Sequence, residues 1–106
     1  MRTEMTRTKW TELRDARLAT FNDEERAEYD HAYRAAALAA LIGEQIRSFR
    51  EEASLTQREL AQRMGTSQAA IARLEAGGVG ATVTTLQRIA DTLGLALTVE
   101  LHRPAA

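Results

Sequence analysis

The chain has 106 residues, 44% of them hydrophobic and 27% charged, which is enough for one compact domain with an appended arm and too little for two full domains. Its 14 Lys and Arg are balanced by 15 Asp and Glu, without the basic surplus usual in nucleic-acid-binding proteins. The absence of cysteine excludes disulfides and thiolate metal sites. The longest apolar run, Ala35–Ile42, is too short to span a bilayer, and the first nine residues lack the apolar core of a signal peptide. We therefore expect a cytoplasmic protein without a membrane segment.

Two helices are predicted in the first half of the chain. The first begins near Thr8 and carries its apolar residues on one side, at Trp10, Leu13, Leu18 and Phe21. Asn22 is a good N-cap for a second helical segment over residues 23–52, which is either one long helix or two that bend in the alanine-rich stretch. Gly43 is the one helix-breaking residue in its interior, and we expect the helix to tolerate it. The apolar spacing of its second half predicts that five residues face a core: Leu38, Leu41, Ile42, Ile46 and Phe49.

Three short helices follow. Thr56 and Glu59 have the spacing of a capping box, and Gly65 lies where a left-handed residue would end the first of these helices. The second is expected over residues 68–76, capped by Thr66-Ser67, with Ile71 and Leu74 facing inward and with glycines at 77–80 after it. The third is expected from Thr84 to Leu93 and stops at Gly94.

The apolar period then changes from that of a helix to that of a strand. Leu95, Leu97, Val99 and Leu101 alternate with less apolar residues, so we predict one β-strand at the C-terminus. A single strand has no partner within its own chain, and unpaired backbone groups are costly. A second chain, either a symmetric copy or another protein, would then complete the sheet.

Two short helices joined by a tight turn that contains glycine form a helix-turn-helix, which places its second helix in the major groove of DNA. The segment TQRELAQRMGTSQAAIARLEAGG resembles this motif in the Cro/repressor (Xre-type) transcription factors. That resemblance implies a phosphate contact by Gln57, which also braces the first recognition residue. The alternative to DNA binding is a helical hairpin whose Gln and Arg side chains are exposed to solvent and bind nothing. The resemblance and the motif together predict a DNA-binding set: Thr56, Gln57, Arg58, Ser67, Gln68, Ala69, Ala72 and Arg73.

The chemistry of these residues allows a modest direct readout of base sequence. Gln68 can pair with adenine, Arg73 can reach guanine or a phosphate, and Ala69 offers only a methyl group. Each good bidentate contact contributes about 1–3 kcal/mol of discrimination, so one copy would bind weakly and a homodimer on a palindromic operator is expected. The resemblance also implies a structural ion pair between Arg50 and Glu75. Ser54 stands where the family usually has glycine, at a cost of about 1 kcal/mol if its backbone is left-handed.

The whole outline is similar to HigA-type antitoxins of type II toxin–antitoxin modules. That similarity implies a second partner, a basic ribonuclease toxin of the RelE/HigB type. Residues 23–30 carry five acids against one arginine, which would attract a basic partner, although acids in the first turn of a helix also simply complement its dipole. The apolar residues of the arm either pack on their own domain, which is the commoner outcome, or contact the toxin. The predicted partner contacts are Trp10, Leu13, Phe21, Glu28, Asp30 and Tyr33.

No enzyme, cofactor or metal site is expected. Only His31 and His102 are available as histidines, and Glu28-x-x-His31 lacks the second copy that a two-carboxylate metal site needs. The predicted fold is an all-α helix-turn-helix bundle over residues 38–94, with a helical arm over 1–37 and a strand and tail over 95–106. The predicted function is an antitoxin that represses its own operon; the alternative is a stand-alone Xre-type regulator without a toxin.

Overall fold

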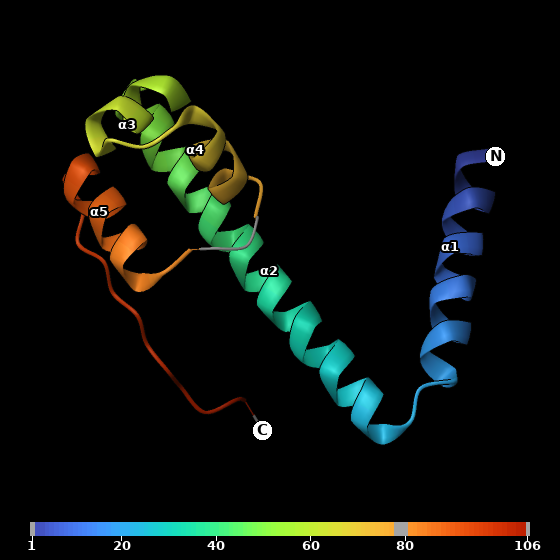
Figure 1. Ribbon diagram of the computed structural model, residues 1–106. Helices are drawn as coiled ribbons and strands as arrows, with labels where there is room; N and C mark the ends of the chain where they lie inside the picture. Colours follow the sequence, from blue (N-terminus) through green and yellow to red (C-terminus); the bar gives the residue numbers. More distant parts are fainter. Residues whose placement is uncertain (1, 78–80, 106) are drawn as a thin grey trace. The chain divides into compact units, whose positions relative to one another are not determined.

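The computed structural model describes residues 2–77 and 81–105, and their side chains except those of residues 2–8 and Trp10. The described residues form five helices: α1 (Arg2–Ala19), α2 (Asp23–Glu52), α3 (Gln57–Met64), α4 (Gln68–Glu75) and α5 (Val83–Leu93) (Figure 1). The chain divides into two compact units, Met1–Ala35 and Ala36–Ala106, and the boundary between them in the sequence falls within α2. None of the helices in these described ranges is long and apolar enough to cross a membrane.

The predicted helical bundle is confirmed, and the predicted C-terminal strand is wrong. Residues 95–105 leave α5 without helix or strand (Figure 1). A strand is defined by backbone hydrogen bonds to a neighbouring strand, and the described part of the chain contains no second strand to supply them. Apolar alternation in the sequence is therefore not sufficient to make residues 95–101 a strand. Elsewhere the structure gives one continuous helix for residues 23–52, and α1 begins at Arg2, before the predicted start at Thr8.

The ends of the short helices follow from capping side chains and left-handed residues. Thr56 and Glu59 form the predicted capping box, because each side chain accepts a hydrogen bond from the backbone of the other residue. Gly65 ends α3 with φ 69° and Gly94 ends α5 with φ 70°, the region where glycine has no steric penalty. Ser54, just after α2, is also left-handed, with φ 58°. The glycine-rich segment 77–80, predicted to end α4, lies outside the described residues except for Gly77.

The core of the second unit lies between α2, α3, α4 and α5. Leu60 and Ile71 are completely buried, and Ala61 lets α3 approach its neighbours closely. The side chains that form the core cluster or pack against it are Ile42, Ile46, Leu60, Ala61, Met64, Ile71, Leu74, Leu86, Ile89 and Leu93. The prediction that Leu38, Leu41 and Phe49 also face the core is wrong, since they are 59%, 58% and 42% exposed.

The first unit is held by a few local contacts around the turn between α1 and α2. The Asn22 side chain accepts from the Glu25 backbone N–H at 2.7 Å, as its predicted capping role requires. The rings of Phe21 and Tyr29 meet edge to face with centroids 6.0 Å apart. Among the residues of this unit whose side chains are described, none is buried. The described side chains of this unit therefore form no buried core.

Candidate nucleic-acid interface

Helices α3 and α4 form the two arms of a helix-turn-helix. The turn between them uses the left-handed Gly65 and then Ser67, whose hydroxyl accepts from the Ala70 backbone N–H at 3.1 Å and so starts α4. Because Ile71 is completely buried, α4 has one fixed orientation on α3. Three of the predicted recognition residues, Gln68, Ala69 and Arg73, are exposed on α4, and Ala72 is half-buried.

A shallow hollow of about 410 Å³ lies on one side of the start of α4. It is lined by Arg50 from α2, by Thr56, Gln57 and Arg58 at the start of α3, and by Gln68 at the start of α4. These residues come from three helices, and they present amide and guanidinium donors to one space. Arg58 supplies a positive charge to an anion in this hollow, whereas the charge of Arg50 is paired with Glu75.

A second hollow, of about 300 Å³, lies between α4 and α5. Arg73 and Arg88 line it together with Thr66 and Thr85, so it also offers donors to an anion. The Arg88 guanidinium donates to the Met64 carbonyl and is fixed at the end of α3. The recognition helix is thus flanked by two hollows that each contain arginines.

The carboxylate of Glu75, at the end of α4, holds three helices together. Its side chain is only 1% exposed. Arg50 donates to both of its oxygens, at 2.6 Å to Oε2 and 2.9 Å to Oε1, which matches the predicted ion pair. Gln57 Nε2 donates to Oε1 at 3.2 Å, and Arg47 Nε lies 3.8 Å from the same oxygen. Arg50 also donates to the Leu55 carbonyl at 2.8 Å, which ties α2 to the residues before α3.

The charges of this cluster are stabilised by its hydrogen bonds. Burial by itself raises the pKa of the Glu75 carboxyl, but the hydrogen bonds from Arg50 and Gln57, with the charges of Arg50 and Arg47, outweigh it and hold that pKa below its ordinary value. The hydrogen bond to Glu75 raises the pKa of the Arg50 guanidinium. Glu75 is therefore an ion at neutral pH, and its charge is matched within the protein.

The approach of α4 to α2 depends on Gly43. A Cβ added at Gly43 would lie 2.6 Å from the backbone carbonyl oxygens of both Leu74 and Glu75. A helix with any side chain at this position could not come so close. The helix continues through this glycine, as expected, and the absence of a side chain there is what admits the end of α4.

The predicted partner contacts on the arm are mostly exposed. Leu13 and Tyr33 are 53% and 61% exposed, and Glu28 and Asp30 are also exposed. Phe21 is half-buried against Tyr29. The predicted contact at Trp10 lies outside the described side chains.

No metal cluster of three or more His, Asp or Glu side chains occurs where side chains are described. His31 is exposed on α2, and its neighbour in the sequence motif, Glu28, is exposed as well.

Sequence reasoning missed three contacts: Gln57 with Glu75, Arg47 with Glu75, and Arg88 with the Met64 carbonyl. Each joins residues at least eighteen positions apart, so no local spacing encodes it. Gly43 did leave a signal, because an isolated glycine in a periodic helix marks a place where another backbone can approach.

Comparison with known proteins gives one family and two structural neighbours. The helix-turn-helix family model HTH_3 matches residues 46–99, about half of the chain. Two solved structures, described as "MDT Protein" and "Structure of HipA-HipB-O2-O3 complex", each contain a chain 28% identical to this one with a TM-score of 0.53. Each match covers 61% of this chain and 92% of the solved one. No curated protein matches.

Proposed function

This chain belongs to the HTH_3 helix-turn-helix family, a family of DNA-binding regulators and not of enzymes, and on that premise we propose that it is an antitoxin that represses its own operon. One observation supports DNA binding through α4. Helix α4 exposes Gln68, Ala69 and Arg73 between two hollows that contain arginines. A duplex with its major groove on α4 would place phosphates at both hollows.

The proposed contacts divide into positioning and readout. Gln57, Arg58 and the hydroxyl-bearing helix caps Thr56 and Ser67 bind the phosphate backbone, which is the sequence-independent part of the affinity. Gln68 and Arg73 contact base edges, and the small Ala69 and Ala72 let the helix lie close to thymine methyl groups. The proposed DNA contacts are thus Thr56, Gln57, Arg58, Ser67, Gln68, Ala69, Ala72 and Arg73.

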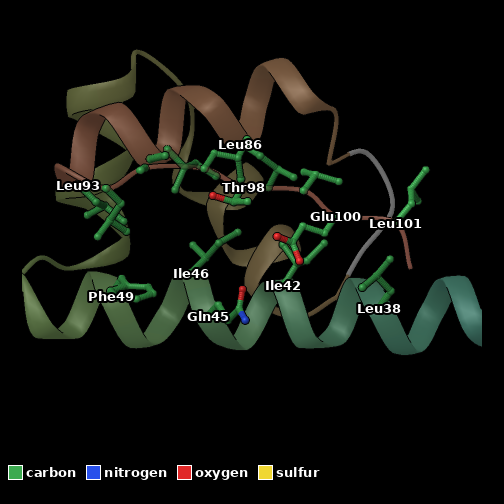
Figure 2. A pocket seen from close by; sticks show the side chains of 16 residues that line it. Leu38, Ile42, Gln45, Ile46, Phe49, Leu86, Leu93, Thr98, Glu100 and Leu101 are labelled. Atoms are coloured by element: carbon green, nitrogen blue, oxygen red, sulfur yellow. The ribbon is translucent and has the colours of Figure 1, made fainter. Parts of the chain in front are cut away.

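A homodimer is proposed because one copy of this short helix offers too few base contacts for specific binding. The structure also leaves an apolar groove of about 410 Å³ between α2, α5 and the tail, shown in Figure 2. Leu95 and Leu97 are half-buried beside it, whereas Val99 and Leu101 are 69% and 100% exposed. A second copy that packs its tail and groove on those of the first would bury these side chains.

The antitoxin role rests on the first unit and on the neighbour structures. The described side chains of residues 9–35 include exposed apolar and acidic groups and no core, which is expected of a segment that packs on a partner. One structural neighbour is in an assembly named for two proteins, HipA and HipB. The proposed partner here is a basic ribonuclease of the RelE/HigB type, by the similarity of the sequence to HigA-type antitoxins. A stand-alone Xre-type regulator is the alternative.

Electrophoretic mobility with the promoter fragment of its own operon tests the DNA contacts. Gln68→Ala and Arg73→Ala should each weaken binding by about tenfold at equal salt, the value of one base contact. Gln87→Ala and Arg34→Ala serve as matched controls, because both residues are exposed and lie outside the two hollows. Equal affinity of Gln68→Ala, Arg73→Ala and the parent would overturn the assignment.

Co-purification with the product of the neighbouring reading frame tests the partner. Removal of residues 1–34 should abolish capture of a basic protein of toxin size and leave promoter binding intact, because the buried core lies in the second unit. Loss of both activities together, or of neither, would contradict the role of the arm. Absence of any captured protein would favour the stand-alone regulator.

A further inference from the structure

The amide of Gln57 is held in one orientation before any DNA is bound. Its Nε2 donates to Glu75 Oε1 at 3.2 Å, and a carboxylate can only accept. The contact therefore fixes which end of the amide is nitrogen and which is oxygen. Gln57 also lines the hollow with Arg58 and Gln68. Its side chain therefore lies between the Glu75 carboxylate and this hollow.

An amide nitrogen carries two N–H groups that diverge in one plane. One N–H of Gln57 is taken by Glu75, so the other points away from Glu75. If the amide were flipped, its carbonyl oxygen would take the place of the nitrogen, and an oxygen repels both the carboxylate and a phosphate. The buried carboxylate thus selects the rotamer that can donate twice.

Glu75 can do this without repelling DNA. Its side chain is 1% exposed, and Arg50 neutralises it through two hydrogen bonds. The guanidinium of Arg47, 58% exposed, lies 3.8 Å from the same oxygen that receives the Gln57 N–H. The cluster therefore places the Arg47 guanidinium on the oxygen that holds the Gln57 amide, and the Glu75 charge is paired. The exposed Glu51 carboxylate lies 4.0 Å from Arg50 Nη2.

From this geometry we propose that Glu75 is a positioning residue for DNA binding: it orients the Gln57 amide so that its second N–H donates to a backbone phosphate at the Gln57–Arg58–Gln68 hollow. The proposal rests on the proposed phosphate role of Gln57. It gives Glu75 a role in affinity beyond that of a structural ion pair with Arg50. A purely structural Glu75 would affect DNA binding equally whatever residue stood at position 57.

A double-mutant cycle separates the two roles. The affinity for a mixed-sequence DNA duplex at fixed salt is measured for the parent, Gln57→Ala, Glu75→Gln and the double variant, at a temperature where circular dichroism shows all four folded. Glu75→Gln should weaken binding about fivefold when Gln57 is present and less than about twofold when position 57 is alanine, a coupling typical of two side chains in contact.

The same factor in both backgrounds would overturn the positioning role and leave the phosphate contact standing. If Gln57→Ala alone left the affinity unchanged, the phosphate contact of the proposed function would fail, and the positioning role with it. The two failures are thus distinguishable.

A measurement on the parent protein does not depend on how Glu75→Gln folds. In NMR spectra, protons of the Gln57 side-chain amide should show proximity to Glu75 in the free protein and keep it when the duplex is added, while their chemical shifts change. Loss of that proximity on DNA binding would mean that the amide leaves Glu75 to reach the phosphate, and would overturn the proposal.

Discussion

Gly43 in the middle of α2 lies against the backbone carbonyl of Glu75, so close that a Cβ on Gly43 would be 2.6 Å from that oxygen. Two turns further along the same helix, Arg50 binds the Glu75 side chain. One residue at the end of the recognition helix is therefore held by its backbone and by its carboxylate. Both contacts fix the position of α4 against the rest of the domain.

Gly43→Ala should destabilise the protein, although alanine is the better helix former. In an open helix this change stabilises by about 0.5–1 kcal/mol. Here the added methyl group would press α4 away from α2, and overpacking of this kind costs about 1–3 kcal/mol. Urea denaturation measures whether the free energy of unfolding falls or rises in the variant. Ser48→Ala, at an exposed position on the same helix, should leave the stability almost unchanged. A Gly43→Ala variant as stable as the parent, or more stable, would contradict the overpacking, since its cost would then not exceed the gain in helix propensity of about 0.5–1 kcal/mol.

Glu75→Gln should change how stability depends on pH. The pKa of Glu75 is lowered in the folded state, so the unfolded chain binds more protons, and the free energy of unfolding falls as pH drops below the ordinary carboxyl value of about 4.3. Above that value the contribution is fully present, and loss of the buried pair should cost about 3 kcal/mol at pH 7.

The advantage of the parent over Glu75→Gln should therefore shrink as the pH falls below about 4.3. Chemical denaturation at several pH values measures both proteins in parallel. Hydrogen bonds with Thr56 also lower the pKa of Glu59. Its effect on the free energy of unfolding is the same in the parent and in Glu75→Gln, so it cancels when the two proteins are compared. An advantage that stayed constant down to acidic pH would contradict the ionised pair.

Arg58→Ala should weaken DNA binding for all sequences and reduce its salt dependence. Arg58 is exposed at the start of α3 and lines the hollow with Gln68. Loss of one phosphate charge contact lowers the slope of log affinity against log salt by about 1. Fluorescence anisotropy with a labelled duplex at several salt concentrations gives the slope. Gln57→Ala is the informative comparison, because it removes a neutral donor: affinity should fall with little change in slope. An unchanged slope for Arg58→Ala would place this arginine away from the DNA.

Val99→Asp combined with Leu101→Asp should weaken the proposed homodimer in favour of the monomer. Both side chains are largely exposed in the single chain, so the charges cost the monomer little, whereas burial of two carboxylates in an interface is unfavourable. Analytical ultracentrifugation across a concentration series gives the association constant. Asp substitutions at the exposed Leu13 and Tyr33 of the first unit provide the control and should not affect the dimer. A dimer that persisted with both tail charges would show that it forms elsewhere.

Much of this protein could be predicted from local sequence, because helices, their caps and their turns depend on residues a few positions apart. The capping box of Thr56 and Glu59, the left-handed Gly65 and the apolar positions of α3 to α5 all involve such short spacings. The ion pair of Arg50 and Glu75 was within reach only through resemblance to a family, since nothing local links two residues twenty-five positions apart.

Only the tertiary structure decided the rest. Alternation of apolar residues predicted a strand over residues 95–101, but a strand exists only where another backbone pairs with it, and the described chain offers none. Helical spacing placed Leu38, Leu41 and Phe49 inside, but spacing defines a face of a helix and not what covers it. The sequence by itself determined the helices and the motif, which are local. The structure decided which faces are covered and that Gly43, Arg47, Gln57 and Glu75 meet, because burial and contact depend on how distant segments pack.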